Sequence, residues 1–160
     1  MKDFAIHKAV WTIRKYANDQ DFENGNPFEI AKIEGNVLLN EGIAVLQTLL
    51  IGTGGTPWSN ANAYLGVGDS ATAAAASQTG LQAATNKTYM PMEASYPSVA
   101  SQTTTWRAVF GSGDANFDWN EFTIVNASTD TGDNLNRKVS VQGTKASGQT
   151  WTLDLAITWS

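Results

Sequence analysis

Apolar and polar residues alternate with a period of two along much of the chain, which is typical of β-strands with one buried face. The longest such run covers residues 150–159. Its apolar side consists of Trp151, Leu153, Leu155, Ile157 and Trp159. Shorter alternating runs occupy residues 106–110, 122–125 and 135–141. Short strands at regular spacing predict an all-β fold, an antiparallel β-sandwich or jelly-roll-like body.

The last two predicted strands are separated by a segment that contains Gly143 and Gly148. Glycines between two alternating runs favour a turn, so we expect these strands to form an antiparallel hairpin. We also expect the apolar face of residues 150–159 to lie in the core and the other face to be exposed to water.

One short helix is predicted near the middle of the chain. Its start is indicated by Asn36 or Asn40, either of which can cap a first turn, and its end by Gly52. Apolar residues follow one face at helical spacing: Leu39, Ile43, Leu46 and Leu50. The Ala-rich residues 71–77 are compatible with a helical turn or with a surface loop, and the sequence leaves both open.

The N-terminal residues differ in charge from the rest of the chain. Residues 1–17 hold four basic residues and one acidic residue, a net charge of +3, whereas the whole chain has a net charge of −5. Alternation in residues 5–14 predicts a strand, and the Asn-rich, acidic residues 18–27 predict a linker. We therefore expect residues 1–35 to be an extended arm with its linker and residues 36–160 to be the β body, which should fold after removal of residues 1–17.

Composition excludes several kinds of chemistry. The chain has no Cys and one His, so thiolate sites, disulfides and His-pair metal motifs are absent from the sequence. The net negative charge disfavours nucleic acid as a partner, and no apolar run has the length of a membrane span. Only 16% of the residues are charged, which is low for a globular protein and is typical of a turn-rich β protein.

No motif in the sequence predicts an enzyme, a cofactor or a metal site. The triplet at Asp130 is better explained as a turn, because no apolar strands surround it. Asp114, Asp118 and Glu121 lack the spacing of a calcium loop, and we expect them to be solvated. Among the six tryptophans, Trp58 lies in a Gly/Pro/Asn-rich segment and is the candidate for an exposed contact.

Several short phrases of residues 36–160 resemble small virion structural proteins of tailed bacteriophages, of the capsid cement or decoration type. They include residues 60–70 (NANAYLGVGDS), residues 117–122 (FDWNEF) and residues 143–153 (GTKASGQTWTL). The resemblance implies a non-enzymatic, multi-copy protein on the virion, assembled in the host cytoplasm. The segments also resemble attachment modules of fibres. A tail-fibre or receptor-binding module that recognises a glycan is therefore the alternative.

The charge and strand patterns of the sequence favour a position on the head of the particle. A basic strand could add to the edge of the major capsid protein, and we expect the capsid-binding residues to be Lys8, Trp11, Ile13, Arg14 and Lys15. Apolar strand faces need a cover, which a homotrimer would provide, with Trp151, Leu155, Ile157 and Trp159 at the subunit interface. The sequence thus predicts a capsid cement protein on the outer surface of the shell that it stabilises, without a nucleic-acid or membrane partner.

Overall fold

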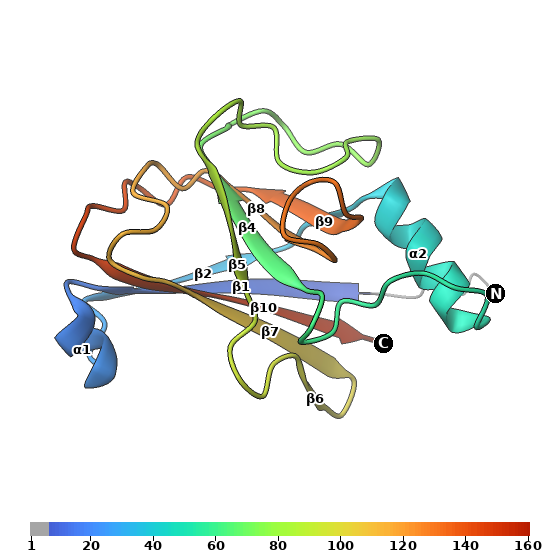
Figure 1. Cartoon of the computed structure of the whole chain (residues 1–160), viewed down its shortest axis with the longest axis horizontal. Helices are drawn as coiled ribbons and strands as arrows, with labels where there is room; N and C mark the ends of the chain where they lie inside the picture. The colour runs from blue at the N-terminus through green and yellow to red at the C-terminus, as the bar shows by residue number, and fades with distance from the viewer. Residues whose placement is uncertain (1–6) are drawn as a thin grey trace.

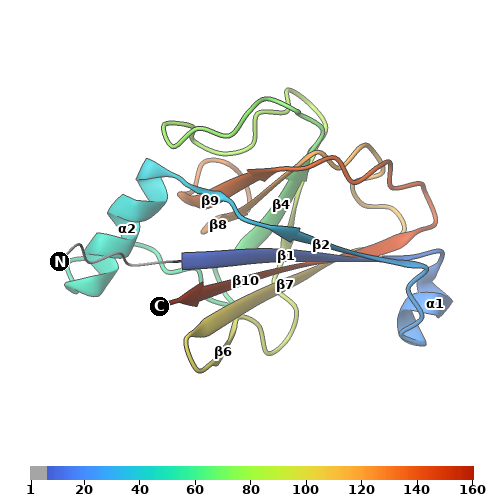
Figure 2. The same cartoon turned by 180° about the vertical axis from the view of Figure 1, so that it is seen from behind.

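The computed structural model describes residues 7–160 and contains two five-stranded antiparallel sheets (Figures 1 and 2). Sheet A has the order β2 (Glu29–Glu34), β1 (His7–Tyr16), β10 (Thr150–Trp159), β7 (Thr103–Phe110) and β6 (Ser98–Ala100). Sheet B has the order β3 (Val37–Leu38), β9 (Asn134–Val139), β8 (Glu121–Val125), β4 (Tyr64–Gly68) and β5 (Lys87–Pro91). The predicted all-β, sandwich-like body is therefore confirmed.

The core lies between the two sheets and follows the alternation of the strands. The inward face of β10 is the apolar face that the sequence predicts, and Leu153, Leu155 and Ile157 on it are fully buried. Aromatic rings fill one part of the core, where Trp119 lies 4.8 Å from Phe110 and 4.9 Å from Trp151 between ring centroids. Edge-to-face contacts of this kind add to the stabilisation that burial of the rings provides.

The outward face of β10 is also covered, which contradicts the expectation of a water-exposed face. Thr150, Thr152 and Asp154 on this face are buried. The physical reason is the position of β10 at the centre of sheet A, between β1 and β7, where long side chains of both neighbours reach over it. A central strand has neighbours on both sides, and alternation alone does not show this.

Residues 7–16 form no free arm. They are β1, which pairs with β10 over ten residues and with β2 on its other side. Trp11 and Ile13 are fully buried in the core between the sheets. The predicted division at residue 35 is wrong for the described residues, because β1 and β2 belong to the same sheet as the C-terminal strand. The strand itself was correctly predicted; its long-range partner was not.

The predicted capsid-binding residues are therefore corrected. Trp11 and Ile13 belong to the core, and Lys15 is 95% buried by its contacts: its Nζ donates to Glu29 Oε1 at 2.8 Å and to the Gln142 carbonyl at 2.7 Å. Lys8 is exposed and forms a surface ion pair with Glu34. Arg14 is half-buried on the outer face of sheet A. Only these last two side chains can reach a partner.

The predicted C-terminal hairpin is also wrong. β9 belongs to sheet B, whereas β10 belongs to sheet A, so the segment between them crosses from one sheet to the other. The two positive-φ glycines in it, Gly143 and Gly148, serve separate turns of this crossing. Backbone hydrogen bonds hold the segment against the residues before β8, such as the one from Lys145 N to Phe117 O.

The predicted helix is present as α2 (Asn40–Leu50), which ends before Gly52 with φ of +70°. Its predicted asparagine cap is wrong, because Leu39 is the N-cap residue and no side chain caps the helix. The predicted apolar face is wrong in part: Ile43 and Leu50 are exposed, and the helix packs on the core through Val45, Leu46 and Leu49. Gly42 lies where the helix meets β9: a Cβ atom at this position would lie 2.5 Å from the Leu135 Cα atom. The glycine therefore permits a close approach of helix and sheet. A second helix, α1 (Asp19–Glu23), lies in the predicted linker, and the Ala-rich residues 71–77 form no helix.

Replacement of Trp11 by Ala tests the role of β1 in the core. We expect the free energy of unfolding to fall by about 3–5 kcal/mol, because a large buried ring is replaced by a cavity. Chemical denaturation followed by circular dichroism measures this change. Lys8→Ala in the same strand is the control, and it should change the free energy of unfolding by less than about 0.5 kcal/mol. Equal stability of both variants would contradict the central position of β1.

Candidate functional site

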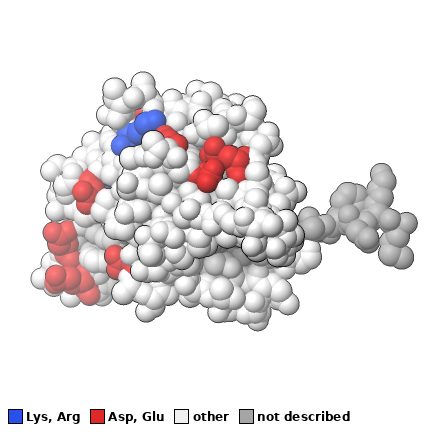
Figure 3. Space-filling model, turned by 45° about the vertical axis from the view of Figure 1, so that its right-hand side comes forward, with Lys and Arg blue, Asp and Glu red and all other residues white. Residues whose placement is uncertain are grey.

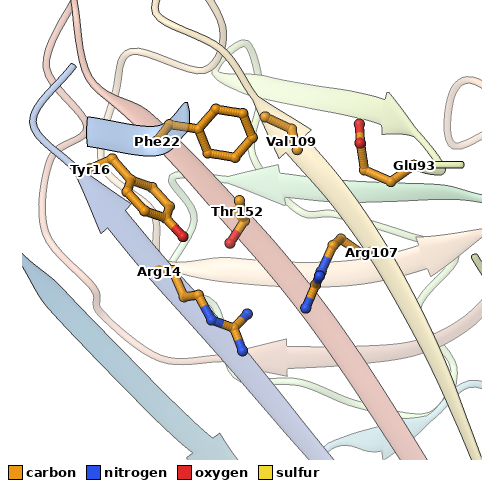
Figure 4. A pocket seen from close by; sticks show the side chains of 7 residues that line it. All are labelled: Arg14, Tyr16, Phe22, Glu93, Arg107, Val109 and Thr152. Carbon is orange, nitrogen blue, oxygen red and sulfur yellow. The ribbon is translucent and has the colours of Figure 1, made fainter. Parts of the chain in front are cut away.

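The outer face of sheet A carries a hollow of about 410 Å³ (Figure 4). Its lining comes from three strands, from α1 and from the segment after β5. The residues are Arg14, Tyr16, Phe22, Glu93, Arg107, Val109 and Thr152. Its volume lies in the range of small-molecule sites, whereas nothing in the sequence groups these residues.

Strand register brings the floor of the hollow together. Thr152 on β10 lies opposite Arg14 on β1 and opposite Val109 on β7. Two residues further along β10, Asp154 lies opposite Arg107. Because side chains two residues apart on a strand share a face, all of these side chains point away from the core.

Asp154 holds both arginines of the hollow. Its Oδ2 atom accepts from Arg14 Nη1 at 2.8 Å and from Arg107 Nη2 at 2.6 Å, and its Oδ1 atom accepts from Arg107 Nε at 2.7 Å. The hydrogen bond with Asp154 raises the pKa of Arg107 above its ordinary value, against the opposite effect of burial. Two permanently charged guanidinium groups around one carboxylate leave a net positive charge at the floor.

The Thr152 hydroxyl is a buried group at this floor that lacks a hydrogen-bond partner. The side chain is 97% buried, and its Oγ1 atom has no hydrogen-bond partner among the described residues. In Figure 4 the Thr152 side chain lies between Tyr16 and the two arginines. A buried hydroxyl without a partner is unfavourable, so a ligand atom that reached it would remove that cost.

Both rims of the hollow are fixed to the sheet. On one side, Phe22 of α1 packs edge-on against Tyr16 at 5.3 Å between ring centroids, and the Thr150 hydroxyl donates to Asp19 at the start of α1. On the other side, the Glu93 backbone N–H donates to the Arg107 carbonyl, and Asn60 Nδ2 donates to the carbonyl of Glu93. The hollow is thus formed before any ligand binds.

Three of the four predicted interface residues do not lie at the surface. Trp151, Leu155 and Ile157 are buried in the core of the chain itself, so they cannot form a subunit interface. Trp159 is 38% exposed and lies 5.8 Å from the His7 ring. Trp58, the predicted exposed aromatic, is buried, and its Nε1 donates to the Asp133 carbonyl at 3.1 Å.

The acidic residues considered for a cation have other partners. Glu121 is fully buried and forms an ion pair with the equally buried Arg137, with 2.6 Å between Oε2 and Nη2. It also accepts from the backbone N–H groups of Gln82 and Ala83. The expectation that Glu121 is solvated is wrong. In residues 7–160 no group of three or more His, Asp or Glu residues could hold a metal ion.

A second surface lies at the end of the sandwich that carries α2 and the C-terminus (Figures 1 and 2). We call it the apolar end and define it by Leu50, Ile51, Val99 and Trp159, which are all exposed. Val99 belongs to this end because it pairs with Thr104, which pairs with Ile157 near the end of β10. On the face of the described residues drawn in Figure 3, Lys, Arg, Asp and Glu form a few separate patches and most of the surface carries none of them.

Comparison of the chain with protein-family models, with curated proteins and with solved structures found no match. Neither helix in the described part of the chain has the length and hydropathy of a membrane span. The geometry of the two surfaces is therefore the basis of any functional assignment.

Replacement of Asp154 by Asn tests whether this carboxylate organises the hollow. We expect the free energy of unfolding to fall by about 1.5–3 kcal/mol, because the charge-assisted hydrogen bonds to both arginines are weakened. Thermal or chemical denaturation measures the change. Glu34→Gln, which removes the exposed ion pair with Lys8, should cost less than about 1 kcal/mol. Similar losses in both variants would show that Asp154 has no special structural role.

Proposed function

We propose that this chain is a bacteriophage virion structural protein, a capsid cement or decoration protein that binds the outer surface of the major capsid protein shell and stabilises it. The apolar end is the observation that carries the proposal. Leu50 is 86% exposed, Ile51 is 71% exposed and Val99 is 72% exposed. Exposed apolar patches of this kind mark protein–protein contacts rather than solvent-facing surfaces. A cement protein acts by adhesion, for which such a surface is sufficient.

Other features of the fold agree with a structural role. The β10 strand is held between β1 and β7 along its length, and the chain has no cysteine that oxidation could alter outside the cell. The sheets carry many long-range contacts, which suits a protein that must persist on a particle. Lys8 and Arg14, the accessible members of the predicted capsid-binding set, lie on the outer face of sheet A rather than on an arm.

The edge strand β2 is the proposed contact between neighbouring copies. One row of its backbone groups has no strand partner in the described chain, and Ile30 of this strand and Phe28 just before it are more than half exposed. Exposed strand edges promote association, and a closed homotrimer would cover three of them at once. This surface replaces the buried β10 residues as the proposed subunit interface.

The hollow on sheet A favours a second candidate function, a tail-fibre or receptor-binding attachment module. It offers charged, hydroxyl and aromatic groups in a preformed depression, as a recognition site does. Copy number separates the two functions: quantitative gel analysis of virions should find hundreds of copies of a cement protein, but only a few to tens of a tail component.

The double variant Leu50→Ser, Ile51→Ser tests shell binding by the apolar end. We expect it to fold normally, because both side chains are exposed, and to lose most of its binding to purified empty shells in a sedimentation assay. Val141→Ser, at another exposed apolar residue outside the apolar end, is the matched control and should bind as the parent does. Undiminished binding of the double variant would refute the proposed docking surface.

Light scattering of the purified chain at micromolar concentration tests the trimer. We expect the mass of three copies for the parent and a shift toward one copy for Phe28→Ser, Ile30→Ser, because the apolar cover of the β2 edge is reduced. The Leu50→Ser, Ile51→Ser variant should remain trimeric. A parent protein with the mass of one copy would contradict the trimer in solution.

A further inference from the structure

We infer that the hollow on the outer face of sheet A binds a carboxylated pyranose, a sugar ring with an acid group of the hexuronate kind. The inference names a ligand class for a site that the shell-binding role does not use. Three observations together support it: unused guanidinium donors, an unpartnered buried hydroxyl, and a carboxylate acceptor and a partly exposed aromatic ring at the rims.

The floor is suited to a carboxylate. Asp154 occupies Nη1 of Arg14 and both Nε and Nη2 of Arg107. Nε and Nη2 of Arg14 and Nη1 of Arg107 have no hydrogen-bond partner among the described residues. Both guanidinium groups lie on the same face of sheet A as the Thr152 hydroxyl, which also lacks a partner. Guanidinium groups bind carboxylates through paired hydrogen bonds, and the residual positive charge of the floor favours an anion.

The side chains at the rims of the hollow favour a ligand that has hydroxyl and C–H groups in addition to a carboxylate. Glu93 lies at one margin, where its carboxylate can accept hydrogen bonds from hydroxyl groups and repels a second negative charge. Phe22 at the other margin is partly exposed and offers apolar ring surface against which the C–H groups of a sugar can pack, and the buried Tyr16 ring holds it in place. A ligand with an acid at one end and hydroxyls at the other fits both margins, whereas a simple carboxylate fits only the floor.

The arrangement is rigid, which lowers the cost of binding. Arg107 is held between the Asp154 carboxylate and the face of the Tyr96 ring, 4.8 Å from the ring centroid. Asn60 fixes the turn that carries Glu93 and Tyr96 by donating to both of their carbonyls. Little conformational entropy remains to be lost when a ligand enters.

Isothermal titration calorimetry of the intact chain with D-glucuronate tests the inference. We expect saturable binding that is at least tenfold tighter than that of D-glucose or of acetate. Thr152→Val, which keeps the side-chain volume and removes the unpartnered hydroxyl, should keep the fold and weaken glucuronate binding several-fold. Thr105→Val, on the same sheet face outside the hollow, is the matched control and should leave the affinity unchanged.

Three results would overturn the inference. Equal affinity for glucuronate and glucose would remove the role of the arginines in carboxylate binding, and equal affinity for glucuronate and acetate would remove the role of the rims. Tighter binding of a Glu-containing tripeptide than of glucuronate would assign the hollow to an acidic protein segment instead. The assay uses the isolated chain, so its result is independent of the shell-binding test, and failure of one does not produce failure of the other.

Discussion

The antiparallel pairing of β1 with β10 is the constraint on which the rest of this structure depends. It joins the two ends of the described chain over ten residues and places both strands at the centre of sheet A. One face of the pair supplies Trp11 and Leu155 to the core, where they lie opposite each other. The other face supplies Arg14 and Thr152 to the hollow. Core and candidate site are therefore two sides of one strand pair.

The buried charged side chains connect strands and loops to one another through hydrogen bonds and ion pairs. Asp154 connects β1 and β7 across β10 through the two arginines of the hollow. Glu121 and Arg137 connect β8 with β9, and the carboxylate also holds the backbone of residues 82 and 83. Such groups are costly to bury unless every oxygen has a donor, so removal of one partner affects more than one element. Asp154 differs from Glu121 because its arginines remain partly open to solvent and keep unused donors.

Local patterns in the sequence predict the strand β10 and the presence of the helix α2, because alternation and helical spacing each report the local backbone. They do not report which strand pairs with which. The alternation in β1 therefore predicted a strand but not its burial at the centre of a sheet, and the glycines after β9 suggested a hairpin where the chain changes sheets. The hollow could not be predicted from the sequence either, because Arg14, Arg107 and Thr152 are brought together only by long-range strand pairing. Asp154 is the one local signal, since it is the only charged residue of β10 and a buried carboxylate requires partners.

The apolar end and the hollow lie at opposite ends of β10, and this separation decides whether their proposed roles compete. Thr152 is near the start of the strand and Trp159 is its last residue, so at about 3.3 Å per residue these two residues are roughly 23 Å apart along it. α1 and α2 mark the same two ends of the molecule (Figures 1 and 2). A molecule attached to a shell by its apolar end would therefore carry the hollow on the part that remains free. Adhesion and recognition of a small ligand are compatible in one copy, because neither surface covers the other.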